Sequence, residues 1–207
     1  HDHMKEGRPD LSFLDKEGVK MLGDRQIKFL NDWKMDWTGT DMKVLLSQTV
    51  FANVATHHGN YAGYLYGDLD SGGWPKSGRD KAIRIMRQVG AFQVSGDQHV
   101  PSLVQYGLNE FRDANWCFCT PAIAVMYLRW FRADEVGYPV VDRPAHGYPN
   151  TGKYTDAFGN KKYVYAIGNP GQNVVNKESR YSHAQLRSSG FGMMTFDQRE
   201  RTIDIDA

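Results

Sequence analysis

The segment Ala91-Phe-Gln-Val-Ser-Gly-Asp-Gln-His99 has the pattern of a short apolar strand that runs into a polar turn. In open α/β sheets, ligands bind beyond the carboxyl ends of the strands. Asp97 and His99 lie two residues apart on a turn that Gly96 opens, so their carboxylate and imidazole can reach one ion. A divalent cation accepts such mixed oxygen and nitrogen ligands and can convert bound water into hydroxide near neutral pH. An isolated Asp-x-His is nevertheless more often an ordinary solvated turn, and this segment alone leaves both interpretations open.

The segments upstream of this turn predict an α/β alternation. Apolar residues recur at helical spacing within residues 22–37, and Asp24 is available to cap that helix. The apolar run 42–51 predicts a buried strand, and 77–89 predicts a second helix. Between them, residues 55–76 predict a long irregular loop, which is uncommon unless it builds a site. This order is expected of a layered sheet with helices on its faces.

After residue 100 the pattern changes to short strand-like segments. The sequence Asp156-Ala-Phe-Gly-Asn160 predicts a hairpin turn between Tyr154 and Tyr163. The C-terminal end alternates polar and apolar residues, as a half-buried strand does. The predicted strands are 102–106, 114–119, 161–167, 191–196 and 202–205.

Composition and charge narrow the classes of partner. The 207 residues are 41% apolar and 24% charged, which is typical of a globular protein. The 25 Lys and Arg against 24 Asp and Glu give a formal charge of +1, so no global excess attracts a nucleic-acid polymer or an anionic lipid. The longest nearly uninterrupted apolar run, 121–128, is far shorter than the roughly 20 residues of a membrane-spanning helix. We therefore expect no membrane span and no nucleic-acid binding.

Two short features remain to be interpreted. Cys117 and Cys119 are spaced too closely for an ordinary disulfide and are too few for a structural zinc site, so we predict two buried small residues. The leader His1-Asp2-His3-Met4 either derives from a purification tag or forms a weak metal-binding His-x-His. The abrupt start leads us to expect a piece of a longer fold.

Four features in order resemble the PhoD-type (alkaline phosphatase D) branch of the calcineurin-like metallophosphoesterases. They are Leu22-Gly-x-x-Gln26 before a Trp-containing helix, the strand 43–48, the loop Asp68-Leu-Asp-Ser-Gly-Gly-Trp-Pro75 with Arg79 following, and Ser95-Gly-Asp-Gln-His99. The family has a Leu-Gly-x-x-Gln helix, a Trp-Lys-Val strand, an Asp-Gly-Tyr-Pro loop before an Arg-bearing helix, and Ser-Gly-Asp-x-His. The resemblance covers residues 20–131 and implies an α/β sandwich of the calcineurin-like metallophosphoesterase type.

The resemblance implies a metal centre. Asp97 and His99 match the last metal-binding motif of the family. Asp70 lies where the family has its Asp-Gly-Tyr-Pro loop, although extra residues stretch the spacing, and we assign it as a metal ligand. His57 and His58 follow a strand end where related phosphoesterases place one metal-binding His. Adjacent histidines point in different directions, so at most one would ligate, and we assign His57; a pair of surface-loop histidines is the alternative.

The resemblance also implies contacts with a phosphate ester substrate. Arg79 matches the Arg that follows the loop in the family, and a guanidinium there could bind a phosphate with two parallel hydrogen bonds. The alternative for Arg79 is an exposed residue at a helix start. Trp74 lies in the same loop and is assigned as a substrate contact. The implied reaction is hydrolysis of a phosphate mono- or diester that depends on divalent or trivalent metal ions, with calcium, iron, zinc and manganese as candidates.

Several ligand motifs of the family are missing from this chain. The family begins with Asp-x-His, then Gly-Asp-x-x-Asp, then an Asn-His or Asp-His pair, and none of them precedes residue 22 in this order. We therefore expect residues 1–131 to be the C-terminal half of a PhoD-like domain, and residues 132–207 to be a β-rich C-terminal extension packed on it. Such a chain should bind metal weakly and have little activity alone. A missing N-terminal half, or a second chain in an oligomer, would complete the site.

The alternative function is a non-catalytic carbohydrate- or protein-binding module. Aromatic residues in the loops could stack on sugars or mediate assembly. Those residues are Tyr61, Tyr64, Tyr66 and Trp74. An extracytoplasmic location is implied by the family resemblance alone.

Overall fold

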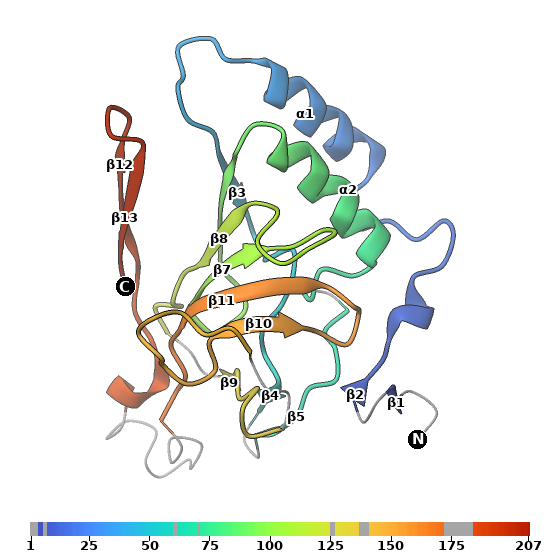
Figure 1. The fold of residues 1–207 in the computed structure, drawn as a ribbon, viewed down its shortest axis with the longest axis vertical. Coiled ribbons are helices and arrows are strands. Elements are labelled where there is room, and N and C mark those ends of the chain that lie inside the picture. Colours follow the sequence, from blue (N-terminus) through green and yellow to red (C-terminus); the bar gives the residue numbers. More distant parts are fainter. Residues whose placement is uncertain are drawn as a thin grey trace.

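A six-stranded mixed sheet forms the centre of the protein (Figure 1). The computed structural model describes residues 4–5, 8–59, 62–69, 71–124, 127–136, 141–171 and 184–207. The strand order is β10-β11-β7-β8-β6-β3, in which β3, β6 and β8 are parallel and the other pairs are antiparallel. The strands are β3 (Val44–Ser47), β6 (Phe92–Ser95), β7 (Ser102–Tyr106), β8 (Trp116–Cys119), β10 (Gly152–Thr155) and β11 (Lys161–Ile167). The chain therefore has a mixed α/β fold, and the calcineurin-like sandwich stays a prediction.

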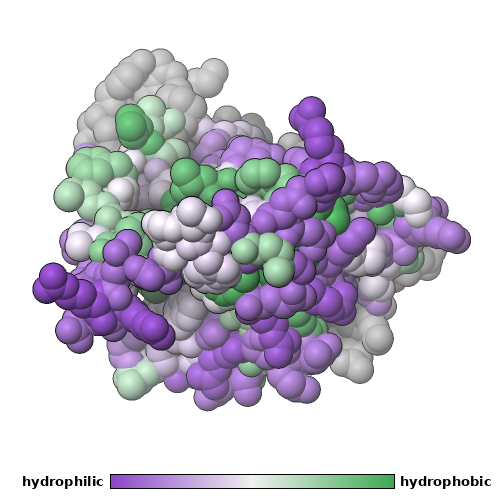
Figure 2. All heavy atoms as spheres, turned by 90° about the horizontal axis from the view of Figure 1, so that it is seen from above, coloured by the Kyte–Doolittle hydropathy of each residue, from purple (hydrophilic) through white to green (hydrophobic). Residues whose placement is uncertain are grey.

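Two helices pack together against one face of this sheet (Figure 1). They are α1 (Asp24–Met35) and α2 (Lys76–Arg87), and both confirm the helices predicted from apolar spacing. The start of α1 differs from the prediction, because Gly23 is the N-cap and donates its N–H to the Gln26 side chain at 2.9 Å. The surface seen from the helix side is largely hydrophilic, as the outer faces of amphipathic helices should be (Figure 2).

The strand predicted to be buried is in fact at the edge of the sheet. β3 pairs only with β6 among the described strands, so its other side has no strand neighbour. Leu45 faces the helices and packs on the core, whereas Leu46 points to the opposite face and its side chain is 76% exposed. An apolar run has the same sequence pattern in a central and in an edge strand, which explains the error.

The remaining elements are short. β4 (His57–His58), β5 (Gly63–Tyr64) and β9 (Arg129–Trp130) form a small sheet in the order β5-β4-β9. β12 (Met193–Asp197) and β13 (Thr202–Asp206) form a hairpin, which confirms the two C-terminal strand predictions to within two residues. β1 (Met4–Lys5) pairs with β2 (Arg8–Pro9), and two 3₁₀ turns cover Ser12–Leu14 and Ala184–Arg187. None of the helices described here is long and apolar enough to cross a membrane.

The second half of the chain contributes to the central sheet itself. β11 pairs with β7, and the predicted hairpin brings β10 beside β11 with Tyr154 opposite Lys162. Strands from both sides of the boundary predicted after residue 131 therefore form one sheet. The division into a domain and an extension stays a prediction.

A buried segment with no regular secondary structure, residues 50–56, follows β3. Each of its seven residues has an exposed fraction of 9% or less. A buried backbone outside a sheet or helix must find partners for its N–H and C=O groups elsewhere, because leaving them unpaired costs about 1–3 kcal/mol each. We refer to residues 50–56 as the buried segment.

Side chains from distant elements supply partners for the buried segment. The Tyr106 hydroxyl accepts the Phe51 N–H at 2.9 Å, and the Arg79 Nε–H donates to the Phe51 carbonyl at 3.2 Å. Lys162, which is fully buried, donates to the Asn53 carbonyl and also pairs with Asp156 at 2.8 Å. Burial lowers the pKa of Lys162, and the neighbouring carboxylate opposes that shift. The buried side chains of Arg79 and Lys162 therefore fix the backbone of the buried segment in place.

We expect Arg79→Ala to lower the free energy of unfolding by about 3–5 kcal/mol, because Asp80 and several backbone carbonyls would lose a buried charged partner. Arg79→Lys should not restore stability, since one ammonium group cannot make the hydrogen bonds that the guanidinium donates to three carbonyls. Arg84→Ala, at an exposed position of the same helix, serves as the control. Urea denaturation followed by circular dichroism measures the effect, and wild-type stability of Arg79→Ala would contradict this account.

Candidate functional site

The predicted Asp-x-His turn lies at the carboxyl end of β6, between the ends of β3 and β8. These three strands are parallel, so the segments that follow them meet at one edge of the sheet. The Thr120 N–H donates to the Ser95 carbonyl at 2.8 Å and joins the β6 and β8 ends. Asp97 is exposed and His99 is half-buried. The structure thus places both candidate ligands where α/β sheets bind ligands.

Both candidate ligands have a left-handed backbone. Asp97 has φ of 69° and His99 has φ of 55°. This region is uncommon for residues other than glycine, and such strain persists only where the surroundings hold it. Residues with strained backbones cluster at functional sites. Two such residues in one turn therefore make this turn a candidate functional site.

Gln98, between the two candidate ligands, ties the turn to three other segments. Its side chain is only 1% exposed. The amide nitrogen donates to the Thr49 hydroxyl at 3.3 Å and to the Ser71 carbonyl at 3.1 Å, and the amide oxygen accepts from Arg129 at 3.4 Å. Satisfying one buried amide in this way fixes the backbone on either side of it.

The imidazole of His99 is held by Tyr127. The distance from His99 Nδ1 to the Tyr127 carbonyl oxygen is 2.6 Å, and the Tyr127 hydroxyl bonds His58 Nδ1. A carbonyl only accepts, so His99 Nδ1 carries a proton, and in the neutral ring Nε2 then has the lone pair. Tyr127 therefore brings His58 and His99 together.

His57, which we assigned as a ligand, lies on the other face of its strand. Side chains alternate along β4, so His58 shares a face with Arg129, and His57 shares one with Trp130 and Tyr64. The His57 ring contacts the Tyr64 ring edge-on and lies 3.0 Å from the Thr56 hydroxyl. Burial, and then the charge of Arg132, lower the pKa of His57. The structure thus brings His58, rather than His57, towards the turn.

The other predicted metal ligand, Asp70, lies outside the described residues. Within the part of the chain that the structure describes, no three His, Cys, Asp or Glu side chains form a group that could hold a metal ion. Cys117 and Cys119 are buried free thiols, as predicted, and burial raises their pKa values to about 11 and about 12. The described residues therefore offer two ligands on the turn and no complete metal site.

The position of Arg79 argues against the predicted phosphate contact. No part of this side chain is exposed. Its guanidinium donates to the carbonyls of Phe51, Gly107 and Lys161 and pairs with Asp80 at 2.8 Å. A phosphate could bind only if these bonds were broken, so Arg79 has a structural role in this fold. Arg79 follows the loop in sequence, as the resemblance requires, but its partners are distant in sequence and could not be foreseen.

Trp74 lies in a groove beside β3, apart from the turn. The groove is also lined by α1 residues and by the stretch 45–51, and the Trp74 indole N–H donates to the Leu14 carbonyl at 3.3 Å. Of the aromatic residues expected in a binding module, Tyr64 and Tyr66 line a different pocket and Tyr61 lies outside the described residues. Of the predicted site residues that the structure describes, none other than Trp74 lines this groove.

Sequence reasoning missed the ion pair of Asp68 and Arg129 beside the turn. Arg129 contacts Asp68 at 2.6 Å and Ser71 at 3.3 Å in addition to Gln98. Asp68 also accepts the Ser71 hydroxyl at 2.5 Å. Asp68 is part of the loop motif quoted above from the sequence, so it could have been considered as a site residue. Arg129 lies in a strand of two residues, which is too short to show a periodic sequence pattern.

Comparisons with known proteins give a partial likeness. No family model matches the chain, and no curated protein sequence matches it. One similar solved structure is that of PhoD, with a TM-score of 0.37 and 19% sequence identity over 50% of this chain. The match covers 20% of the PhoD chain. A TM-score of 0.37 indicates only a loose likeness between the two structures.

Proposed function

We propose that this chain supplies part of the catalytic site of a metal-dependent phosphoric ester hydrolase, with Asp97 and His99 as metal ligands. The proposal rests on the ordered motifs that resemble the PhoD-type family and on the geometry of the turn. Both residues project from a strained turn at the carboxyl end of a central parallel strand.

The observation that carries the proposal is the contact between His99 Nδ1 and the Tyr127 carbonyl oxygen at 2.6 Å. The Nδ1–H of His99 donates to this carbonyl, which leaves the Nε2 lone pair of the neutral ring as a donor to a cation. A backbone carbonyl bonded to the other ring nitrogen is the usual support of a metal-binding histidine, because it fixes the ring and raises its basicity. Asp97 adds an exposed carboxylate two residues away.

The donor set fits a borderline or hard cation. One carboxylate oxygen and one imidazole nitrogen suit zinc, manganese, iron or, less well because of the nitrogen, calcium. When bound, such an ion supplies a hydroxide nucleophile and polarises the phosphoryl oxygens. The residues of this chain would orient that ion, since Gln98 and Tyr127 hold the two ligands in place.

Two ligands do not make a catalytic centre, so the remaining ones must come from other residues. Asp70, the missing N-terminal half of the family domain, or a second copy of the chain in an oligomer are the candidate sources. Arg79 is not proposed as the phosphate contact, because its guanidinium is fully buried and bonded to backbone carbonyls and to Asp80. The substrate class remains a phosphate mono- or diester, and an extracytoplasmic location is proposed from the family resemblance.

Metal binding to purified protein tests this proposal. We expect calorimetry with zinc or manganese to detect weak binding that Asp97→Ala and His99→Ala each reduce by at least about tenfold. His146→Ala and Asp204→Ala remove exposed groups of the same types elsewhere and should bind metal as the wild type does. Slow, metal-dependent hydrolysis of bis(p-nitrophenyl) phosphate is the second readout.

The proposal predicts that the circular dichroism of both ligand variants is unchanged, because Asp97 is exposed and His99 is half-buried. Equal metal affinity of wild type and both variants would contradict it. An intact protein that binds no metal and binds glycans would instead favour the non-catalytic carbohydrate-binding module.

A further inference from the structure

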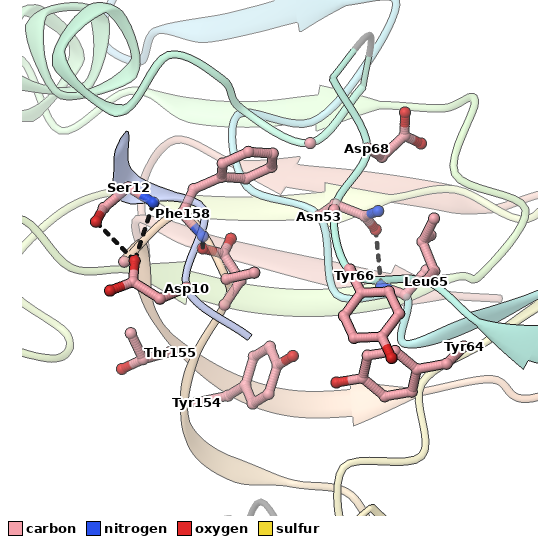
Figure 3. A pocket seen from close by; sticks show the side chains of 16 residues that line it. Asp10, Ser12, Asn53, Tyr64, Leu65, Tyr66, Asp68, Tyr154, Thr155 and Phe158 are labelled. Atoms are coloured by element: carbon pink, nitrogen blue, oxygen red, sulfur yellow. Dashed lines mark hydrogen bonds between the residues drawn. The ribbon is translucent and has the colours of Figure 1, made fainter. Parts of the chain in front are cut away.

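A pocket of about 290 Å³ lies between the N-terminal segment, the loop after β5 and the β10–β11 turn (Figure 3). Its walls come from residues 10–12, 53–55, 64–68 with Gly72, and 154–159. Asp97 and His99 do not line it, so a ligand in this pocket would not need the candidate metal ligands. This size is near the lower limit of small-molecule sites, which suits one ring rather than a large ligand.

Aromatic side chains form much of the pocket wall. The Tyr66 ring is 57% exposed and its centroid lies 4.5 Å from that of Tyr64 in an edge contact. Figure 3 shows Tyr64, Tyr66 and Tyr154 gathered on one side of the pocket, and Asp10 with Ser12 on another. A large exposed ring backed by a second ring is a rigid surface on which a flat, partly apolar ligand can stack.

Polar groups without protein partners face the same space. Asn53 is only 7% exposed, and its side-chain oxygen accepts the Ala55 N–H at 2.7 Å. This bond orients the amide, and its nitrogen makes no hydrogen bond to any described residue. The hydroxyl of Thr155 likewise has no partner among the residues described. The amide N–H groups and the hydroxyl are therefore available to bind water or a ligand in the pocket.

The charges of the pocket decide the class of ligand. Among the described residues that line it, three are Asp, at positions 10, 68 and 156, and none is Lys, Arg or His. A phosphate would find no cation on this wall. Asp68 is paired with Arg129 and Asp156 with Lys162, so two of the carboxylates are already neutralised and a cationic ligand gains little from them.

We propose that this pocket binds a single neutral sugar ring. A pyranose has an apolar face of C–H groups for Tyr66 and hydroxyls around its edge for Asn53, Thr155 and the carboxylate oxygens. This assigns a location to the carbohydrate-binding alternative, and it uses residues from four separate segments. The pocket and the candidate metal turn adjoin through Asp68 and Arg129, which contacts Gln98.

Saturation-transfer NMR on the full chain tests this inference with the methyl glycosides of glucose, galactose, mannose and N-acetylglucosamine. We expect the ring protons of at least one glycoside to receive saturation. Tyr66→Ala should weaken that binding by at least about tenfold, since it removes the stacking surface. Thr155→Val, which keeps the side-chain shape, should weaken it about threefold or more. Tyr148→Ala is the matched control, because Tyr148 is 66% exposed and does not line the pocket.

Four results would overturn the inference. One is the absence of saturation transfer to every glycoside. Another is a Tyr66→Ala variant that binds as the wild type does, which is informative because the exposed Tyr66 should not be needed for folding. The third is displacement of the glycoside by tetramethylammonium at equal concentration, which would identify a cation site. Inorganic phosphate should not displace the sugar, and displacement by it would count against the inference as well.

Discussion

The rest of the structure depends on a buried stretch of backbone that belongs to no helix or sheet. Residues 50–56 pass through the interior, and their N–H and C=O groups must be bonded there. Tyr106, Arg79 and Lys162 supply partners from three different elements. Burying two cations is expensive, and here each is compensated by a carboxylate and by carbonyls. This arrangement explains why a chain of this size buries an Arg and a Lys completely.

The buried segment also positions both candidate sites. A Cβ on Gly73 would lie 2.0 Å from the Phe51 carbonyl oxygen, so the loop that carries Asp68 and Ser71 can approach the segment only as glycine backbone. That loop reaches Gln98 through Ser71 and Arg129 and so supports the strained Asp97–His99 turn. On its other side the segment directs the side-chain amide of Asn53 towards the pocket that Tyr64 and Tyr66 line. The packing of residues 50–56 therefore supports both the candidate metal-binding turn and the neighbouring pocket.

Local patterns were sufficient for most of the elements. Apolar spacing predicted α1 and α2, and short strand-like segments predicted β7 and β11 at their observed positions. The failures arise where the answer depends on distant residues. Leu46 is exposed because β3 has one neighbour, which no feature of its own sequence reveals.

The site shows the same limit. The Asp97–His99 motif is local and could be recognised in the sequence. Which of His57 and His58 faces the turn depends instead on the pairing of β4 with β9, 71 positions apart along the chain. Arg79 was misassigned because its carbonyl partners lie at positions 51, 107 and 161. The pocket was not predicted because it is assembled from four separate segments.

Amide hydrogen exchange of the buried segment tests this account most directly. The N–H groups of Phe51, Ala55 and Thr56 donate to the Tyr106 hydroxyl, the Asn53 side chain and the Trp130 carbonyl. If these bonds hold the interior together, the three amides should exchange as slowly as those of β6 and β7, although they lie in no regular ladder. Exchange as fast as that of the exposed turn at Gly147 would contradict the account, because it would show that the segment opens independently of the core.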